Sequence, residues 1–347
     1  MGHRPNGAWI RSCSALATLG LALVAPAHAQ TTPHENDGPA GLEIAGSAGQ
    51  IAWAKKDYAA LDNLFDQMAL PDERFDDGRS HLMGLSQGLA YAFGANTTPK
   101  DWQQSLDKIR EWRQKNPEST AVDIVESQIL RNWAWAARGK GYSRTVTPEG
   151  WKLFGERMKR AEEVLVRSRE RSSNNPLWYS EYLDVARANH WDRKEFRALY
   201  ETAIARFPDF HYFYFAMLRY LDPDWHGDVE EIDAYIAEAA SKTEARQGKI
   251  MYARLYWYLA DSRNQEFSLF EDSGANWADM KTGFEQLIAA TPNSTWNLNN
   301  FASFACRAGD ADTYRKLRKQ ISERIYNEAW PDNYSMEICD ERLLKAI

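Results

Sequence analysis

The sequence predicts an all-α fold, an irregular right-handed array of antiparallel helix pairs. Apolar residues recur at helical spacing in one segment after another, and caps or prolines begin most of these segments. No two alternating apolar segments flank a hairpin turn, which argues against a β-sheet. The loops between segments are short, so each helix is expected to pack on its neighbour along the chain.

The middle of the chain shows this pattern most clearly. Asn175 can cap a helix whose first residue is Pro176, where the missing N–H costs nothing. Asp192 and Glu195 form a pair like a capping box, which begins a second helix that Pro208 ends. The buried stripe expected on that second helix consists of Phe196, Leu199, Tyr200, Ala203, Ile204 and Phe207.

The same signs predict helices in the rest of the chain. Apolar spacing from 51 to 68 indicates one helix, and Gly139 is expected to end a long helix further on. Thr147 is followed by a proline and can cap the next helix. Gly84 and Gly88 lie one turn apart, which favours a close approach between two helices.

Residues 1–29 are predicted to be a secretory signal peptide. Arg4 and Arg11 supply its basic start, and the apolar run that follows is too short to cross a bilayer. Ala27 and Ala29 fit the cleavage motif. The protein is therefore expected to be exported, either periplasmic or secreted, with no membrane span.

The mature chain is expected to begin with a disordered leader. Residues 30–45 are rich in Thr, Pro, Gly, Asp and Asn, a composition that does not support a packed core. Residues 46–347 are expected to form a single helical domain, with any subdivision near 172–176.

The charge of the mature chain excludes some classes of partner. Cleavage would remove two basic residues and no acidic one, which takes the formal net charge from −7 to −9. An acidic protein lacks the basic face that nucleic acid and anionic membranes require. We therefore expect a protein or peptide partner and no nucleic acid.

Two cysteines remain after cleavage, Cys306 and Cys339. An oxidising compartment permits a disulfide between them, and we predict the bond in exported material. The alternative is a free thiol, because Cys306 lies on an apolar helix face where a thiol packs well.

A basic loop precedes one predicted helix start. Arg138, Lys140 and Arg144 lie close before Thr147, and cations beside free helical N–H groups can form an anion site. The alternative is a solvated turn whose arginines pair with nearby acids.

Tryptophan is abundant, with 14 residues in the chain. Packing between helices explains most of them, and a stacking groove for peptides or sugars is the alternative. Trp178 and Trp225 are candidate contacts in such a groove. His226 next to Trp225 could move a proton or bind a metal, but no second His or Cys follows at ligand spacing, so we predict neither metal nor cofactor.

Three segments resemble a known family: Trp133–Val146, Pro223–Asp228 and Ser294–Asp310. Together they are similar to a bacterial exported family of tetratricopeptide-like helical proteins, known only as a domain of unknown function. The resemblance implies a tetratricopeptide-like α-solenoid that serves as a scaffold or binds partners, without naming the partner. Leu183, Tyr200, Ala203 and Pro208 match the repeat pattern, while Asp184 stands where a small residue is expected.

No phosphate-binding loop, nucleophile elbow or zinc-protease motif is present in the sequence. We therefore expect a non-enzymatic scaffold or a module of the cell envelope that binds proteins or peptides. The alternative is an all-helical carbohydrate-active enzyme or sugar-binding protein, in which two acids would act on a glycosidic bond. The candidate acids for that alternative are Asp192, Asp222 and Asp224.

Overall fold

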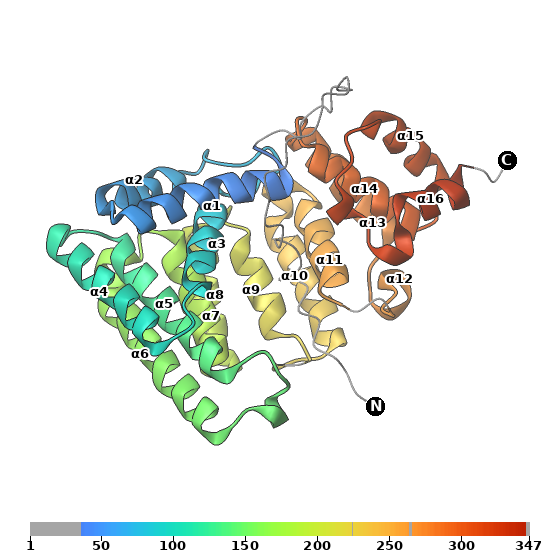
Figure 1. Ribbon diagram of the computed structural model, residues 1–347. Coiled ribbons are helices and arrows are strands. Elements are labelled where there is room, and N and C mark those ends of the chain that lie inside the picture. Colours follow the sequence, from blue (N-terminus) through green and yellow to red (C-terminus); the bar gives the residue numbers. More distant parts are fainter. Residues whose placement is uncertain (1–35, 224, 264–265, 345–347) are drawn as a thin grey trace, which may run out of the picture. The chain divides into compact units, whose positions relative to one another are not determined.

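The computed structural model describes residues 36–223, 225–263 and 266–344, and within them the chain is all-α (Figure 1). These residues form sixteen α-helices and three short 3-10 helices, and they contain no β-strand. The α-helices are α1 (Gly38–Lys55), α2 (Tyr58–Met68), α3 (His81–Gly94), α4 (Pro99–Lys115), α5 (Ala121–Arg138), α6 (Pro148–Ser172), α7 (Pro176–Ala188), α8 (Arg193–Arg206), α9 (Tyr212–Tyr220), α10 (Val229–Gln247), α11 (Ile250–Ser262), α12 (Leu269–Asp272), α13 (Trp277–Ala290), α14 (Thr295–Arg307), α15 (Ala311–Ile321) and α16 (Met336–Leu343). The 3-10 helices are η1 (Ser143–Thr145), η2 (Asn327–Ala329) and η3 (Asp332–Tyr334).

The described helices fall into two compact units. The N-terminal unit comprises 36–235 together with 290–294, and the C-terminal unit comprises the other described residues from 236 onward. The division falls within α10 and not near 172–176. Ser172 and Asn175 are buried in the turn between α6 and α7, so this turn belongs to a packed core and is no linker.

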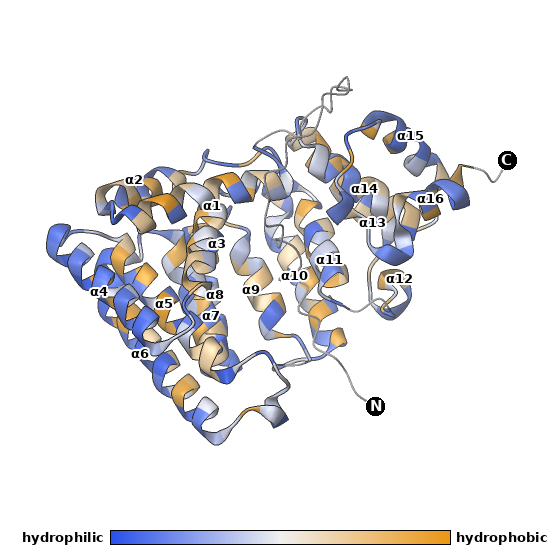
Figure 2. Cartoon of the chain, viewed as in Figure 1, coloured by the Kyte–Doolittle hydropathy of each residue, from blue (hydrophilic) through white to orange (hydrophobic). Residues whose placement is uncertain are grey.

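Neighbouring helices pack on one another in the N-terminal unit. The closest pairs are α5 with α6 and α1 with α3, and α7 contacts α6, α8 and α9 (Figure 1). Apolar and polar residues are interspersed along α4 and α6 (Figure 2), and the buried ones recur mostly every three or four positions. This is the pattern of helices with one face in a core.

The predicted caps are present where the structure describes them. Asn175 accepts a hydrogen bond from Leu177 N, and Asp192 accepts one from Glu195 N. Thr147 caps α6 through Gly150 N. Because these side chains satisfy backbone donors that the helix leaves unpaired, the sequence alone could locate the helix starts.

The first helix differs from its prediction in two ways. It begins at Gly38, so the predicted disorder of residues 30–45 does not hold for residues 38–45. It also ends at Lys55, and the single helix predicted over 51–68 is in fact α1 and α2. Lys56 adopts a left-handed conformation, and Asp57 then caps α2 through Ala60 N. The predicted signal peptide and residues 30–35 lie outside the described residues.

Two glycines bring α1 and α3 together, as the sequence predicts. A Cβ atom added to Gly88 would lie 2.2 Å from the carbonyl oxygen of Gly46, and one added to Gly84 would lie 2.7 Å from the Cβ of Ala45. Side chains at these positions would force the helices apart. This close packing explains why α1 is ordered from Gly38 onward.

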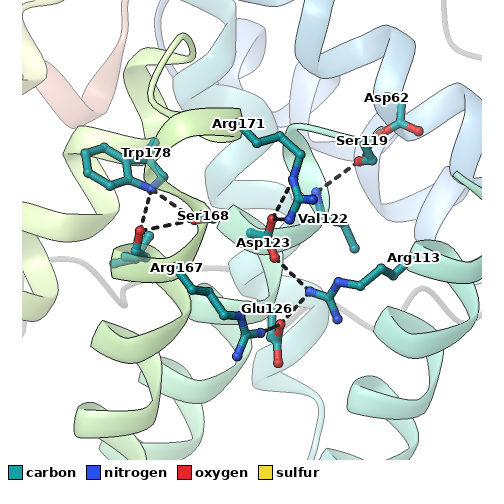
Figure 3. A network of polar contacts seen from close by, with 11 residues as sticks. Asp62, Arg113, Ser119, Val122, Asp123, Glu126, Arg167, Ser168, Arg171 and Trp178 are labelled. Atoms are coloured by element: carbon teal, nitrogen blue, oxygen red, sulfur yellow. Dashed lines mark hydrogen bonds and ion pairs between the residues drawn. The ribbon is translucent and has the colours of Figure 1, made fainter. Parts of the chain in front are cut away.

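A network of ion pairs around a buried carboxylate joins α4, α5 and α6 (Figure 3). Asp123 on α5 is fully buried and pairs with Arg113 at 2.8 Å and with Arg171. Glu126, one turn further on, pairs with the same Arg113 at 2.7 Å and with Arg167 at 2.6 Å. The two acids therefore hold three helices together through arginines from both sides.

Asp184 has a structural role at the position where the repeat pattern expects a small residue. Its carboxylate accepts hydrogen bonds from the Tyr212 hydroxyl at 3.0 Å and from Arg219 at 3.1 Å. Although burial opposes ionisation, Arg219 and Arg131 outweigh it and lower the pKa of Asp184. The departure from the pattern is thus compensated by an ion pair between α7 and α9.

Aromatic rings and a disulfide hold the C-terminal unit together. Phe284 on α13 stacks on Phe301 of α14 with ring centroids 5.1 Å apart. Cys306 and Cys339 are bonded, with their Cα atoms 5.8 Å apart, which confirms the predicted disulfide and joins α14 to α16. Asn299 on α14 accepts hydrogen bonds from Tyr326 N and from the Trp330 side chain, so it anchors the segment around η2.

Reducing this disulfide is expected to destabilise the C-terminal unit. The bond closes a loop with a sequence separation of 33. The loop-entropy model gives about 3–4 kcal/mol for a loop of this length. Thermal unfolding with and without reductant measures the loss, and a Cys306→Ser, Cys339→Ser double variant should not respond to reductant. Two titratable thiols in denatured, unreduced wild-type protein would contradict the bond.

No helix in the described part of the chain is long and apolar enough to cross a membrane.

Candidate functional site

A pocket of about 300 Å³ opens in the C-terminal unit. We call it the C-terminal pocket. Its walls come from the end of α11, the segment that leads into α12, the end of α14, and the segment of η2 and η3. Phe267, Leu269, Phe270 and Pro331 supply apolar surface, and charged side chains lie among them. The lining is thus mixed, with convergent polar and charged groups beside apolar surface, and ligand sites commonly combine the two.

Asp261 is one of the two acids that line the C-terminal pocket. It lies in the last turn of α11 and accepts a 2.7 Å hydrogen bond from Nε1 of Trp257, one turn earlier. The Trp257 ring packs near Phe284 and Phe304, so the aromatic core orients the donor. A carboxylate at a helix C-terminus opposes the helix dipole, so its position does not serve helix stability.

Arg307 is the buried cation of the C-terminal pocket. Its side chain is only 12% exposed, and its guanidinium lies 4.2 Å from the centre of the Phe304 ring. The nearest acid is Asp261, with 3.9 Å between Nη2 and Oδ1, which is too far for a hydrogen bond. Its Nε has no hydrogen-bond partner among the described residues. A desolvated guanidinium is thus held at the pocket with only a loose ion pair.

The surroundings of Asp261 change its acidity. Burial raises its pKa to about 6, and the opposing effects of Arg307 and the Trp257 hydrogen bond are smaller. The side chain is 55% exposed, and part of this surface lines the pocket. The group can change charge near neutral pH, which is common at functional sites.

The disulfide joins the helix that carries Arg307 to the segment after η3. Cys306 precedes Arg307 on α14, and its partner Cys339 is on α16, which follows η3. Tyr334 of η3 lines the pocket, and its ring centre is 5.9 Å from the Arg307 guanidinium carbon. The Tyr314 hydroxyl and Arg318 both bond Asp340 and hold α16 on α15. One wall of the pocket is thereby fixed to the helix that carries its cation.

Replacing Asp261 by Asn is expected to make stability less dependent on pH. The folded pKa of about 6 lies above the unfolded value of about 4. The folded protein therefore binds more protons between these values, and wild-type stability falls as pH rises through this window. Melting curves should show that the stability of the variant rises relative to that of the wild type from about pH 4 to about pH 7. A difference that stays constant with pH would contradict the raised pKa.

In the predicted anion loop of the N-terminal unit, both arginines contact aromatic rings. The Arg138 guanidinium lies 5.4 Å from the Trp135 ring and 5.3 Å from the Trp151 ring, and it donates to two glycine carbonyls of its own loop. Arg144 lies over Tyr142. Lys140 is exposed. The arginines are thus occupied by aromatic rings, and the anion site stays a prediction.

The double change Arg138→Ala with Arg144→Ala separates the two interpretations of this loop. If the loop binds an anion, phosphate or acidic-peptide binding should disappear while the melting temperature stays nearly constant. If the arginines only stabilise the fold through their contacts with aromatic rings, the melting temperature should fall and no anion should bind the wild type. Cation–π contacts at exposed sites contribute about 0.5–1 kcal/mol each, so this structural interpretation predicts that the melting temperature falls by several degrees.

Trp225 and His226 lie in one aromatic cluster of the N-terminal unit. The Arg187 guanidinium is 4.1 Å from the Trp225 ring centre, and the His226 ring stacks on Tyr220 at 4.4 Å. His190 is 5.5 Å from His226. Burial, His190 and the nearby arginines lower the pKa of His226. The described residues contain no group of three or more His, Cys, Asp or Glu side chains that could hold a metal.

Trp178 is not available to a partner, which corrects its prediction as a binding residue. It is 1% exposed, and its indole N–H donates to the Leu165 carbonyl and the Ser168 hydroxyl (Figure 3). Nearly all of α7 is buried, so this ring fills the core.

Of the candidate acids of the carbohydrate alternative, the structure describes Asp192 and Asp222. Asp192 caps α8 by accepting a hydrogen bond from Glu195 N, and a cap explains its conformation fully. Asp222 precedes the Trp225 turn, where its backbone carbonyl accepts from Trp225 N. Asp224 lies outside the described residues.

No protein-family model matches the chain, and no curated protein matches it. The resemblance to the tetratricopeptide-like family therefore stays an expectation, and the function has to be argued from the site itself.

Sequence reasoning missed Asp261 and Arg307. A signal was present, because Trp257 and Asp261 are four residues apart on one helix face and the acid stands where helices favour a cation. Arg307 follows Cys306, but only the fold shows that the disulfide carries η3 to it.

Proposed function

We propose that the protein is a non-enzymatic helical-repeat module of the cell envelope, a tetratricopeptide-like solenoid that binds a protein or peptide. One observation supports a binding role above all. The C-terminal pocket combines apolar walls with a buried arginine that has only a loose ion pair. A buried polar group without a good partner costs roughly 1–3 kcal/mol, and natural proteins retain such groups mainly where they have a function.

Export is part of this proposal. The disulfide supports it, because such bonds persist in oxidising compartments outside the cytosol. The signal-peptide pattern in residues 1–29 is the second support.

The size of the pocket supports a limited ligand. About 300 Å³ is at the small end of ligand pockets, enough for one large side chain and the backbone beside it. The pocket would therefore hold one anchoring residue of a peptide, while the rest of the partner lies outside it.

The test is capture of peptides from an envelope extract beside a cell-wall glycan array. Ala260 lines the pocket, so Ala260→Trp should fill it and abolish peptide capture. Ala278→Trp is the matched control, because Ala278 is exposed on α13 of the same unit. Equal capture by wild type and Ala260→Trp would refute the pocket as the site. Binding to glycans alone would favour the carbohydrate alternative.

A further inference from the structure

Two arginines and two acids line the C-terminal pocket. Arg307 comes from α14 and Arg263 from the segment after α11, while Asp261 and the exposed Glu328 of η2 are the acids. Tyr334 of η3 is the other titratable side chain of the lining, and Trp257 donates to Asp261 from within α11. Protonation of Asp261 would remove one of the two negative charges of this lining and leave Arg307 without its nearest acid.

The Arg307 guanidinium is held in a position where it can bind an anionic ligand. Its guanidinium is held over the Phe304 ring, and the adjacent disulfide restricts the helix end that carries it. Arginine binds carboxylates strongly, because its planar N–H groups match the two oxygens. The Asp261 carboxylate lies at 3.9 Å and does not fill this role. An incoming carboxylate could bind the guanidinium more closely than the resident one.

We infer that the C-terminal pocket binds an apolar residue bearing a carboxylate and takes up one proton with it, the carboxylate pairing with Arg307 and the proton residing on Asp261. The inference rests on the proposed function, since it names the ligand chemistry of the same site. Phe267 and Phe270 supply surface for the apolar group. Protonated Asp261 no longer repels the ligand, and its hydroxyl can donate a hydrogen bond to the ligand carboxylate.

This coupling makes the affinity depend on pH in one direction. The pKa of Asp261 is about 6, so about one molecule in a hundred is protonated at pH 8 and most are at pH 5. If only the protonated form binds, the affinity rises about 100-fold over this range. A peptide carboxylate stays ionised throughout, because its own pKa is below about 4.5.

The test is calorimetric titration of the full-length mature protein with three probes. N-acetyl-phenylalanine carries a terminal carboxylate, and N-acetyl-aspartyl-phenylalaninamide carries a side-chain carboxylate. N-acetyl-phenylalaninamide is the neutral control. At least one acid should bind at least about tenfold more tightly than the amide at low pH. The stronger acid identifies whether the chain end or a side chain is the source.

Two variants test the roles of the charged residues. Asp261→Asn keeps an acceptor for Trp257 without the charge, so it should bind the acid at pH 8 as tightly as the wild type does at low pH, about 100-fold above wild type. Arg307→Met should lose at least about tenfold in affinity for the acid and little for the amide. Arg315→Met, on α15 in an exposed pair, is the control that should change nothing. Circular dichroism and the melting temperature check that each variant is folded, and Arg307→Lys replaces Arg307→Met if that variant is not.

The outcomes separate the two proposals. Equal binding of acid and amide, or an affinity for the acid that does not change with pH, would overturn the inference while leaving peptide binding in place. If no probe binds, the carboxylate inference also fails, and only the capture experiment with Ala260→Trp then decides the proposed function.

Discussion

Replacing Arg113 and Arg171 together by Met is expected to lower the free energy of unfolding by about 3–5 kcal/mol. Both arginines pair with Asp123, which is completely buried between α4, α5 and α6. Their loss leaves a carboxylate with no cation in a low-dielectric core. Met retains the length and apolar surface of the arginine stems, so the loss measures the charge and not the packing.

A control for this prediction lies on the same helix. Arg110 on α4 pairs with Asp107, and both side chains are more than half exposed. Exposed ion pairs contribute at most about 1 kcal/mol, so Arg110→Met should change the free energy of unfolding little. Urea unfolding compares the two variants directly. A double variant as stable as the control would show that Asp123 finds other partners.

Replacing Tyr200 by Ala is expected to cost about 3–5 kcal/mol, the range for emptied aromatic sites. Tyr200 lies mid-stripe on α8 and is 0% exposed, as its sequence pattern predicts. Its ring meets Tyr214 and Tyr235 edge to face, and its hydroxyl is 3.2 Å from that of Tyr235. The substitution removes both ring contacts and leaves a cavity.

Tyr91→Ala serves as the matched control, because this tyrosine is 67% exposed on α3. Surface substitutions of this kind change stability by about 0.5 kcal/mol or less. Tyr200→Phe should lose much less than Tyr200→Ala, because it keeps the ring. A melting temperature that Tyr200→Ala leaves unchanged would contradict the packing of α8 described above.

Helices could be predicted from the sequence because their signals are local. A cap such as Asn175 and the stripe that contains Tyr200 depend on residues within a few turns of one another. The break at Lys56 was missed because apolar spacing continues across it, and only the left-handed backbone and the Asp57 cap separate α1 from α2. The predicted leader was too long because Leu42 and Ala45 at its end lie against Gly84 of α3, a contact that composition cannot show.

The candidate site could not be predicted because it depends on contacts between distant segments. Asp261 and Arg307 are far apart in the sequence and meet only through the packing of α11 on the aromatic core beside α14. Trp178 was predicted as a binding residue from its residue type. Nearly all of its helix is buried, so its ring has no surface to offer a partner. Residue type alone does not distinguish a core ring from a binding ring.

The titration of Asp261 tests the central claim most directly. With 13C-labelled aspartate, its side-chain carboxyl can be followed by NMR and assigned by its absence in Asp261→Asn. We predict a midpoint of about pH 6 in the free protein and a shift to higher pH when N-acetyl-phenylalanine or N-acetyl-aspartyl-phenylalaninamide is added, because an anion beside Arg307 favours the protonated acid. A midpoint near the ordinary value of about 4, unmoved by either acid, would contradict the C-terminal pocket as a carboxylate site.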